Sequence, residues 1–276
     1  GGERRVIPVG FEYARPDSVD GALALLAEHG DEATIMAGGH SLLPVMKLRL
    51  AAPELIVDIG RLRELNYIRV DGDEVAIGAA TRHHDVEVSD VLATEVPLLP
   101  AVARTVGDPQ VRHRGTIGGS LAHGDPASDL PAAVLALDAT IVLRSPRGER
   151  KVPATEFWTA VFTTAKEPDE LIVEIRVPRT GNAGWAYEKF TRRANDWAIV
   201  AVAVVDGRVG LVNMGSTPLR ASATEAALAE GRSIADAAAL AAEGTEPPTD
   251  TAGTPDYRRN LARVLTRRAL ETAAGR

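Results

Sequence analysis

Two glycine-containing segments have the composition of a binding site for a diphosphate group. Residues 37–41 read Ala-Gly-Gly-His-Ser, and residues 116–120 read Thr-Ile-Gly-Gly-Ser. Because glycine has no Cβ atom, successive backbone N–H groups can approach phosphate oxygens closely. Each segment alone is also consistent with an ordinary tight turn, since paired glycines are common there. Together they indicate two loops that hold one dinucleotide diphosphate between them.

A carboxylate follows the second segment at a position that suits two roles. Asp129 stands directly before the apolar run 130–137, which predicts a buried helix. We therefore expect Asp129 to cap the N-terminus of this helix. A carboxylate at a helix start can also accept hydrogen bonds from a ribose, whereas it would repel a phosphate. The two roles are compatible.

The first two thirds of the chain alternate short predicted strands with short predicted helices. Residues 18–29 carry apolar residues at helical spacing, with Ser18 as the N-cap and Gly30 as the stop. A second helix is expected over 97–106. Turns are expected at 71–73 and 146–149. Apolar runs between turn residues predict strands at 33–37, 55–58, 67–70, 74–77, 140–144 and 171–177.

Two adjacent histidines lie at the start of another predicted helix. Thr81 is expected to cap a helix that opens at Arg82, and His83 and His84 follow. Adjacent residues on a helix point about 100° apart, and no third ligand has suitable spacing. The sequence therefore predicts no metal site here.

The segment 178–184, rich in Pro, Gly and Asn, is the expected domain boundary. Beyond it, strands are predicted at 185–189, 198–205 and 208–213, followed by helices at 224–229 and 255–273 with an alanine-rich helix between them. The last helix is amphipathic. Its basic stripe, formed by Arg259, Arg263 and Arg267, either faces solvent or meets an acidic partner. The whole pattern predicts an α+β protein.

Composition limits the class of protein. A chain of 276 residues with a net charge of −7 is unsuited to general nucleic-acid binding, which requires basic residues against phosphates. The absence of cysteine excludes disulfides and any cysteine-ligated iron–sulfur cluster within this chain. No apolar run approaches the roughly 20 residues of a membrane helix. Residues 1–5 lack the apolar core of a secretion signal, so a cytoplasmic location is expected.

These motifs resemble the flavin subunit, or medium chain, of the molybdenum hydroxylases, which include xanthine dehydrogenase and aerobic carbon monoxide dehydrogenases. The resemblance implies a two-part FAD-binding domain of the vanillyl-alcohol oxidase (PCMH) type over residues 1–178, with subdomains of about 1–58 and 59–178. It also implies a carbon monoxide dehydrogenase flavoprotein-type domain over 185–276, in which the predicted strands form a three-stranded antiparallel sheet. The residues that carry the resemblance lie at 7–8, 11–16, 37–44, 46–49, 57–59, 77–82, 115–129, 187–190, 192–193 and 257–259.

The resemblance also implies which residues meet FAD. Both glycine segments would hold the diphosphate, Asp129 would meet ribitol or ribose hydroxyls, and Lys189 would lie near the pyrimidine edge of the flavin. Trp197 either covers a flavin face or packs in a core or interface. Ser120 departs from the family, which usually has Asn there, and a shorter hydroxyl weakens or rearranges that contact. The expected cofactor-binding residues are Ala37, Gly38, Gly39, His40, Ser41, Leu42, Thr116, Ile117, Gly118, Gly119, Ser120, His123, Asp129, Lys189 and Trp197.

The implied function is electron transfer through FAD. Electrons from a molybdopterin-binding large subunit would arrive through an iron–sulfur small subunit and leave to NAD⁺, quinone or oxygen, within a dimer of heterotrimers. FAD suits this junction because it exchanges electrons singly or in pairs. No catalytic acid or base is required in this chain, and His40 and His123 are expected to be structural. Two alternatives remain open: a stand-alone flavoprotein oxidase or reductase, and a non-catalytic module with weakened FAD binding.

Overall fold

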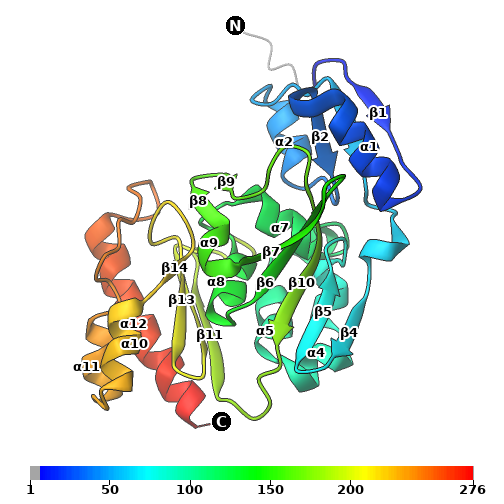
Figure 1. Cartoon of the computed structure of the whole chain (residues 1–276). Coiled ribbons are helices and arrows are strands. Elements are labelled where there is room, and N and C mark those ends of the chain that lie inside the picture. Colours follow the sequence, from blue (N-terminus) through cyan, green and yellow to red (C-terminus); the bar gives the residue numbers. More distant parts are fainter. Residues whose placement is uncertain (1–6, 276) are drawn as a thin grey trace, which may run out of the picture.

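The computed structural model describes residues 7–275. Residues 1–5, where the sequence predicts no secretion signal, lie outside the described residues. The chain forms three units: a small N-terminal unit at the top of Figure 1, a central sheet with helices, and a C-terminal sheet with helices. Within residues 7–275, no helix has both the length and the apolar character needed to cross a membrane.

The N-terminal unit is a parallel sheet of three short strands. Its order is β1 (Glu12–Ala14), β3 (Leu55–Asp58) and β2 (Ala33–Met36). Helix α1 (Val19–His29) packs on this sheet through one apolar face, and Ser18 caps it by accepting the Gly21 amide. A 3₁₀ turn, Gly30–Glu32, leads from α1 into β2, and the short helix α2 (Leu42–Lys47) follows the first glycine segment. The predicted helix and strands are confirmed here.

The central unit is built on a five-stranded antiparallel sheet. Its order is β4 (Ile68–Asp71), β5 (Glu74–Gly78), β10 (Leu171–Pro178), β6 (Thr140–Ser145) and β7 (Gly148–Pro153). Most of its buried strand residues form one core with the helices that cover the sheet, whereas Val142, Leu171 and Val173 pack with the N-terminal unit. The remaining elements of this unit are η2 (Arg63–Leu65), α3 (His83–Glu87), α4 (Asp90–Glu95), α5 (Leu98–Ala103), α6 (Pro109–Arg112), α7 (Ile117–His123), α8 (Asp129–Ala136), α9 (Ala154–Phe157), β8 (Trp158–Ala160) and β9 (Thr163–Thr164).

The C-terminal unit has a four-stranded antiparallel sheet rather than the predicted three strands. The order is β11 (Trp185–Phe190), β12 (Val200–Val205), β13 (Arg208–Val212) and β14 (Leu219–Arg220). The fourth strand has two residues, too few for any alternation to be read from sequence. Helices α10 (Ser222–Ala229), α11 (Ile234–Ala239) and α12 (Pro255–Ala274) complete the unit.

The central and C-terminal units share helix α8. Every residue of β12 is buried, because α12 packs on one face of the sheet and α8 on the other. A Cβ atom at Gly210 would lie 2.2 Å from the Ala132 carbonyl oxygen, so the glycine permits this close approach. Helix α8 therefore fixes the C-terminal sheet against the central unit.

Two predicted helix caps are wrong. Arg82, not Thr81, occupies the N-cap position of α3, and the Thr81 hydroxyl instead donates to the Tyr67 carbonyl oxygen at 3.1 Å. Ser128 occupies the N-cap position of α8, while Asp129 is its first helical residue. In both cases a distant partner takes the side chain, which local sequence rules do not detect.

Candidate functional site

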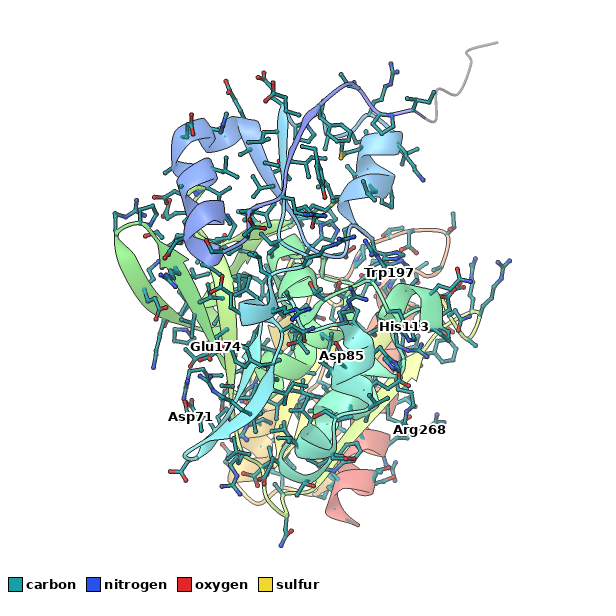
Figure 2. The ribbon with its side chains drawn as sticks, turned by 90° about the vertical axis from the view of Figure 1, so that its right-hand side faces the viewer. Asp71, Asp85, His113, Glu174, Trp197 and Arg268 are labelled. Atoms are coloured by element: carbon teal, nitrogen blue, oxygen red, sulfur yellow. The ribbon has the colours of Figure 1, made fainter. Side chains whose placement is uncertain are left out.

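A cavity of about 840 Å³ lies where the three units meet. Its walls include β2 and the first glycine segment, the start of α7, and the strand and loop that contain Lys189 and Trp197. In Figure 2, Trp197 lies near the junction between the N-terminal unit and the rest of the chain. The volume falls in the range of roughly 300–1,000 Å³ that is typical of pockets for organic ligands. All the predicted cofactor-binding residues line it except Ile117, which is buried in the core.

The first glycine segment offers a row of unoccupied backbone donors. The amides of Leu43 and Val45 already donate to the carbonyl oxygens of Gly39 and Ser41. Among the described residues, by contrast, the five amides of residues 38–42 have no hydrogen-bond acceptor. Gly39 has φ +78°, a left-handed backbone conformation of the kind found where successive N–H groups form an anion-binding concavity. Such a concavity is suited to phosphate oxygens.

The second glycine segment is the first turn of helix α7 rather than a loop. The amides of its residues 117–120 are occupied: Ile117 donates to Thr81 O and Gly118 to Ala79 O, both at 2.9 Å. Gly119 donates to Thr116 Oγ1 at 3.1 Å, which makes Thr116 the N-cap of α7. Ser120 donates to Thr116 O at 3.0 Å. The amides of residues 117–120 therefore already have acceptors within the protein, whereas those of residues 38–42 remain open.

The glycines of the second segment serve close packing instead. A Cβ atom at Gly118 would lie 2.6 Å from the Ala79 carbonyl oxygen. The first segment lies against the residues directly before the second, because a Cβ atom at Gly38 would lie 2.1 Å from Arg114 O and 2.9 Å from Gly115 Cα. The two segments themselves also meet, since a Cβ atom at Gly119 would lie 3.9 Å from Ala37 Cβ. This contact confirms that the two distant segments converge on one cavity.

Asp129, Lys189 and Tyr187 form a polar network at the cavity wall. Lys189 Nζ lies 2.8 Å from Asp129 Oδ2 and donates to Thr105 O at 3.0 Å, and the Tyr187 hydroxyl donates to Asp129 Oδ1. The side chains of Lys189 and Asp129 are 9% and 5% exposed. Burial raises the pKa of Asp129, and the Lys189 ammonium opposes that rise. Each carboxylate oxygen keeps a lone pair for a ligand hydroxyl.

Tyr187 supports the site through Asp129 without lining the cavity, and the sequence alone gave it no role. Loss of solvent around its hydroxyl, and then the Asp129 charge, raise the pKa of Tyr187 well above its usual value. The sequence feature that could have indicated Tyr187 is the two-residue period of strand β11, which places Tyr187 and Lys189 on the same face.

His83 is a second residue whose role the sequence did not reveal. Its side chain is 3% exposed and lines the cavity, and its Nε2 atom lies 3.1 Å from Ser120 Oγ. Burial, with smaller contributions from the charges of His40 and Arg112, lowers the pKa of His83 to about 4. The imidazole is thus neutral at pH 7. Within residues 7–275, no group of three His, Cys, Asp or Glu side chains is arranged to hold a metal ion.

Trp197 and two histidines lie at more open parts of the cavity. Trp197 is 59% exposed and lines the cavity, so it does not pack in a core. The ring of His123 lies 5.1 Å from that of Phe162, and burial lowers the pKa of His123. His40 is exposed. An indole at this position can stack on a planar aromatic ligand.

Comparison with known proteins gives the same family along the whole chain. Residues 9–180 match the FAD binding domain in molybdopterin dehydrogenase, and residues 185–273 match the CO dehydrogenase flavoprotein C-terminal domain. The carbon monoxide dehydrogenase medium chain of Hydrogenophaga pseudoflava is 43% identical over 98% of this chain and 99% of the relative. The glyceraldehyde dehydrogenase medium chain of Sulfolobus acidocaldarius is 38% identical over 97% and 99%.

Solved structures agree with the sequence relatives. A chain of carbon monoxide dehydrogenase from Hydrogenophaga pseudoflava superposes with a TM-score of 0.94 at 45% identity, covering 98% of this chain and 99% of that one. A chain of quinoline 2-oxidoreductase from Pseudomonas putida 86 superposes with a TM-score of 0.90 at 33% identity, with the same coverage. This chain therefore belongs to the FAD-binding medium subunits of the molybdopterin dehydrogenases, the family that includes the carbon monoxide dehydrogenase medium chains.

Proposed function

We propose that this chain holds FAD at the junction of a molybdenum hydroxylase complex and passes electrons from a partner's iron–sulfur clusters to NAD⁺, quinone or oxygen. The observation that carries the proposal is the row of unoccupied amides at 38–42, which lines a cavity large enough for a dinucleotide. FAD belongs at such a junction because its ring accepts electrons singly and releases them in pairs.

Different cavity residues bind different parts of FAD. The amides of 38–42 donate to the diphosphate, and their free N–H groups need no lysine to neutralise it. The remaining lone pairs of Asp129 accept from ribityl or ribose hydroxyls. Lys189 and Trp197 lie at the flavin ring, where a cation and an indole face tune the potential and limit solvent access.

Two kinds of partner subunit follow from the family and from composition. The relatives are medium chains, a name that implies a smaller and a larger subunit. Because this chain has no cysteine, clusters held by cysteine must belong to another chain. We assign the clusters to the small subunit and the molybdopterin to the large one, within a dimer of heterotrimers. The acidic net charge and the matched domains give no role to nucleic acid.

The two predicted domains contribute different residues to the FAD site. Residues 1–178, in subdomains of about 1–58 and 59–178, bind the diphosphate and most of FAD. Residues 185–276 supply Lys189 and Trp197 from strand β11 and the loop after it. The two family matches, 9–180 and 185–273, support this boundary.

The two other hypotheses find less support in the site. A stand-alone oxidase needs a free acid or base over the flavin, but the carboxylate of Asp129 is already engaged by Lys189 and Tyr187. A non-catalytic module with weakened FAD binding does not account for the row of open amide donors beside a large cavity. Electron transfer between partner subunits accounts for both features.

The visible spectrum of the purified full-length chain tests the proposal. Added FAD should remain bound through desalting and give absorption bands near about 370 and 450 nm, as expected of a protein-bound flavin. With the two partner subunits added, the bound flavin should be bleached by the substrate of the large subunit. The same substrate should leave it oxidised when the small subunit is omitted. A chain that stays colourless, or that a small organic substrate reduces without partners, would refute the proposal.

A further inference from the structure

His83 is held rigidly at the point where the two glycine segments meet. Its backbone amide donates to the Gly115 carbonyl oxygen at 2.9 Å. A Cβ atom at Gly115 would lie 2.7 Å from His83 Cδ2 and 2.8 Å from Nε2, so the imidazole lies directly against this glycine. The ring cannot swing without displacing the backbone that also contacts Gly38. Its position is therefore coupled to both halves of the diphosphate site.

The two ring nitrogens of His83 have different surroundings. Nε2 lies 3.1 Å from Ser120 Oγ, whereas Nδ1 is buried without any hydrogen-bond partner among the described residues. A neutral imidazole carries one N–H, and a buried N–H without an acceptor is strongly disfavoured. The proton therefore belongs on Nε2, which donates to Ser120 Oγ. The buried histidine is neutral at pH 7, since its pKa is lowered to about 4.

This tautomer determines what the serine can do. Because Ser120 Oγ accepts from His83, its own hydroxyl proton remains available. No other partner of Ser120 Oγ is present among residues 7–275, and Ser120 lines the cavity. Gly119 is the residue before Ser120, and a Cβ atom there would lie 3.9 Å from Ala37 Cβ. The first turn of α7 therefore borders the segment with the open amides. Ser120 and the residues with open amides line the same cavity.

We propose that His83 is a positioning residue that makes the Ser120 hydroxyl a hydrogen-bond donor to the diphosphate of the bound dinucleotide. The inference rests on the proposed binding of FAD in this cavity.

Binding of FAD to the purified full-length chain, followed by flavin fluorescence, tests the pair. Ser120→Ala should raise the dissociation constant for FAD about tenfold, as expected for one hydrogen bond to a charged group. His83→Phe should weaken binding to a similar extent, and the double variant no further, because the two side chains act as one donor. His83→Gln and Ser120→Asn, which each retain an amide donor, should restore affinity to within about twofold. Independent, additive losses would overturn the inference.

Two comparisons separate this inference from general effects on folding and binding. His84→Phe is the matched control, because His84 stacks on His113 at 4.0 Å and does not line the cavity; it should leave affinity unchanged. Riboflavin, which lacks the diphosphate, should bind equally to wild type and Ser120→Ala. Equal weakening of riboflavin and FAD would refute the assignment to the diphosphate.

The tautomer can be measured without any substitution. Nitrogen-15 NMR of the wild-type chain at pH 7 should show His83 protonated on Nε2 and unprotonated on Nδ1, and the opposite tautomer would overturn the inference. A wild-type chain that binds no FAD would overturn the proposed function and the role of Ser120 together. A wild-type chain that binds FAD with an affinity unaffected by Ser120→Ala would overturn this inference alone.

Discussion

At the scale of single residues, the site depends on glycines whose lack of a side chain allows backbone segments to approach each other closely. Gly38 lies so close to the Arg114 carbonyl oxygen that any side chain would force the first glycine segment away from the backbone that leads into the second. Its φ is not in the left-handed region, so its role is close approach rather than backbone freedom. Gly39 next to it combines a positive φ with the open amides. The sequence pattern could not separate these two roles.

The variant Gly38→Ala tests the close approach. The added Cβ would lie 2.1 Å from Arg114 O, so the variant should lose about 1–3 kcal/mol of stability by overpacking. The same shift of the loop should lower FAD occupancy at least tenfold. Gly10→Ala is the matched control, because a Cβ there meets nothing within 4 Å. Equal FAD content in the two purified variants would contradict the role given to Gly38.

The ion pair between Lys189 and Asp129 has a pH signature. In Lys189→Met the buried carboxylate loses its counter-charge, so the pKa of Asp129, already raised by burial, should rise further. When a carboxyl group has a higher pKa in the folded than in the unfolded protein, the free energy of unfolding falls as pH rises above the pKa of the unfolded state, about 3.9. The variant should therefore differ little from wild type at pH 4 and be clearly less stable at pH 8. Urea unfolding at both pH values measures this, and a penalty independent of pH would contradict it.

At the scale of elements, the second glycine segment matters as a helix start. Thr116 caps α7 by accepting the Gly119 amide, and the remaining amides of this turn bond to Ala79, Thr81 and Thr116. The turn is therefore formed before any ligand arrives. It presents Ser120 to the cavity from a fixed backbone.

Removal of this cap should affect both stability and binding. Thr116→Ala should cost about 1 kcal/mol, as is typical of a lost N-cap, and should weaken FAD binding because the α7 turn borders the cavity. Ser89→Ala is the matched control, since Ser89 caps α4 in the same way but does not line the cavity. Thermal melts and FAD titrations should show stability loss in both variants but binding loss only in Thr116→Ala. Binding loss in both would indicate a general effect of destabilisation.

At the scale of the whole molecule, three units meet around the cavity and share parts of their cores. The N-terminal core includes Leu171 and Val173 of β10, and the central core includes Ala203 and Val205 of β12. The helix α8 belongs to the central core and also covers the C-terminal sheet (Figure 1). A ligand in the cavity touches all three units, so its binding energy should stabilise them together. Two-state ligand linkage predicts about 2.7 kcal/mol at a free FAD concentration of 100 times the dissociation constant.

Hydrogen exchange of the full chain should reveal the different states of the two glycine segments. Without FAD, the amides of 38–42 should exchange rapidly because they have no acceptor, and those of 117–120 slowly because each has one. Added FAD should slow the first group and leave the second nearly unchanged. Protection that appears only at 117–120 on FAD addition would show that the diphosphate lies at the wrong segment.

The sequence by itself determined the α+β class, most strands, the cavity-forming segments and the family, because these depend on local periodicity and on motifs of adjacent residues. It also placed Asp129, Lys189 and Trp197 at the site through resemblance to the family. It did not predict strands β1, β8, β9 and β14, which have two or three residues each and are too short to show alternation. It also did not predict β7, whose residues are mostly exposed, or the caps at Arg82 and Ser128.

Only the tertiary structure decided which polar groups are free to meet a ligand. Gly118 donates to Ala79, Asp129 accepts from Lys189, and Ser120 pairs with His83, each across a long stretch of chain. A hydrogen-bonding group can bind a cofactor only with the capacity that its protein partners leave unused. The packing of distant elements determines those partners. Two glycine segments with similar sequences therefore differ in how many amides they leave open to a ligand.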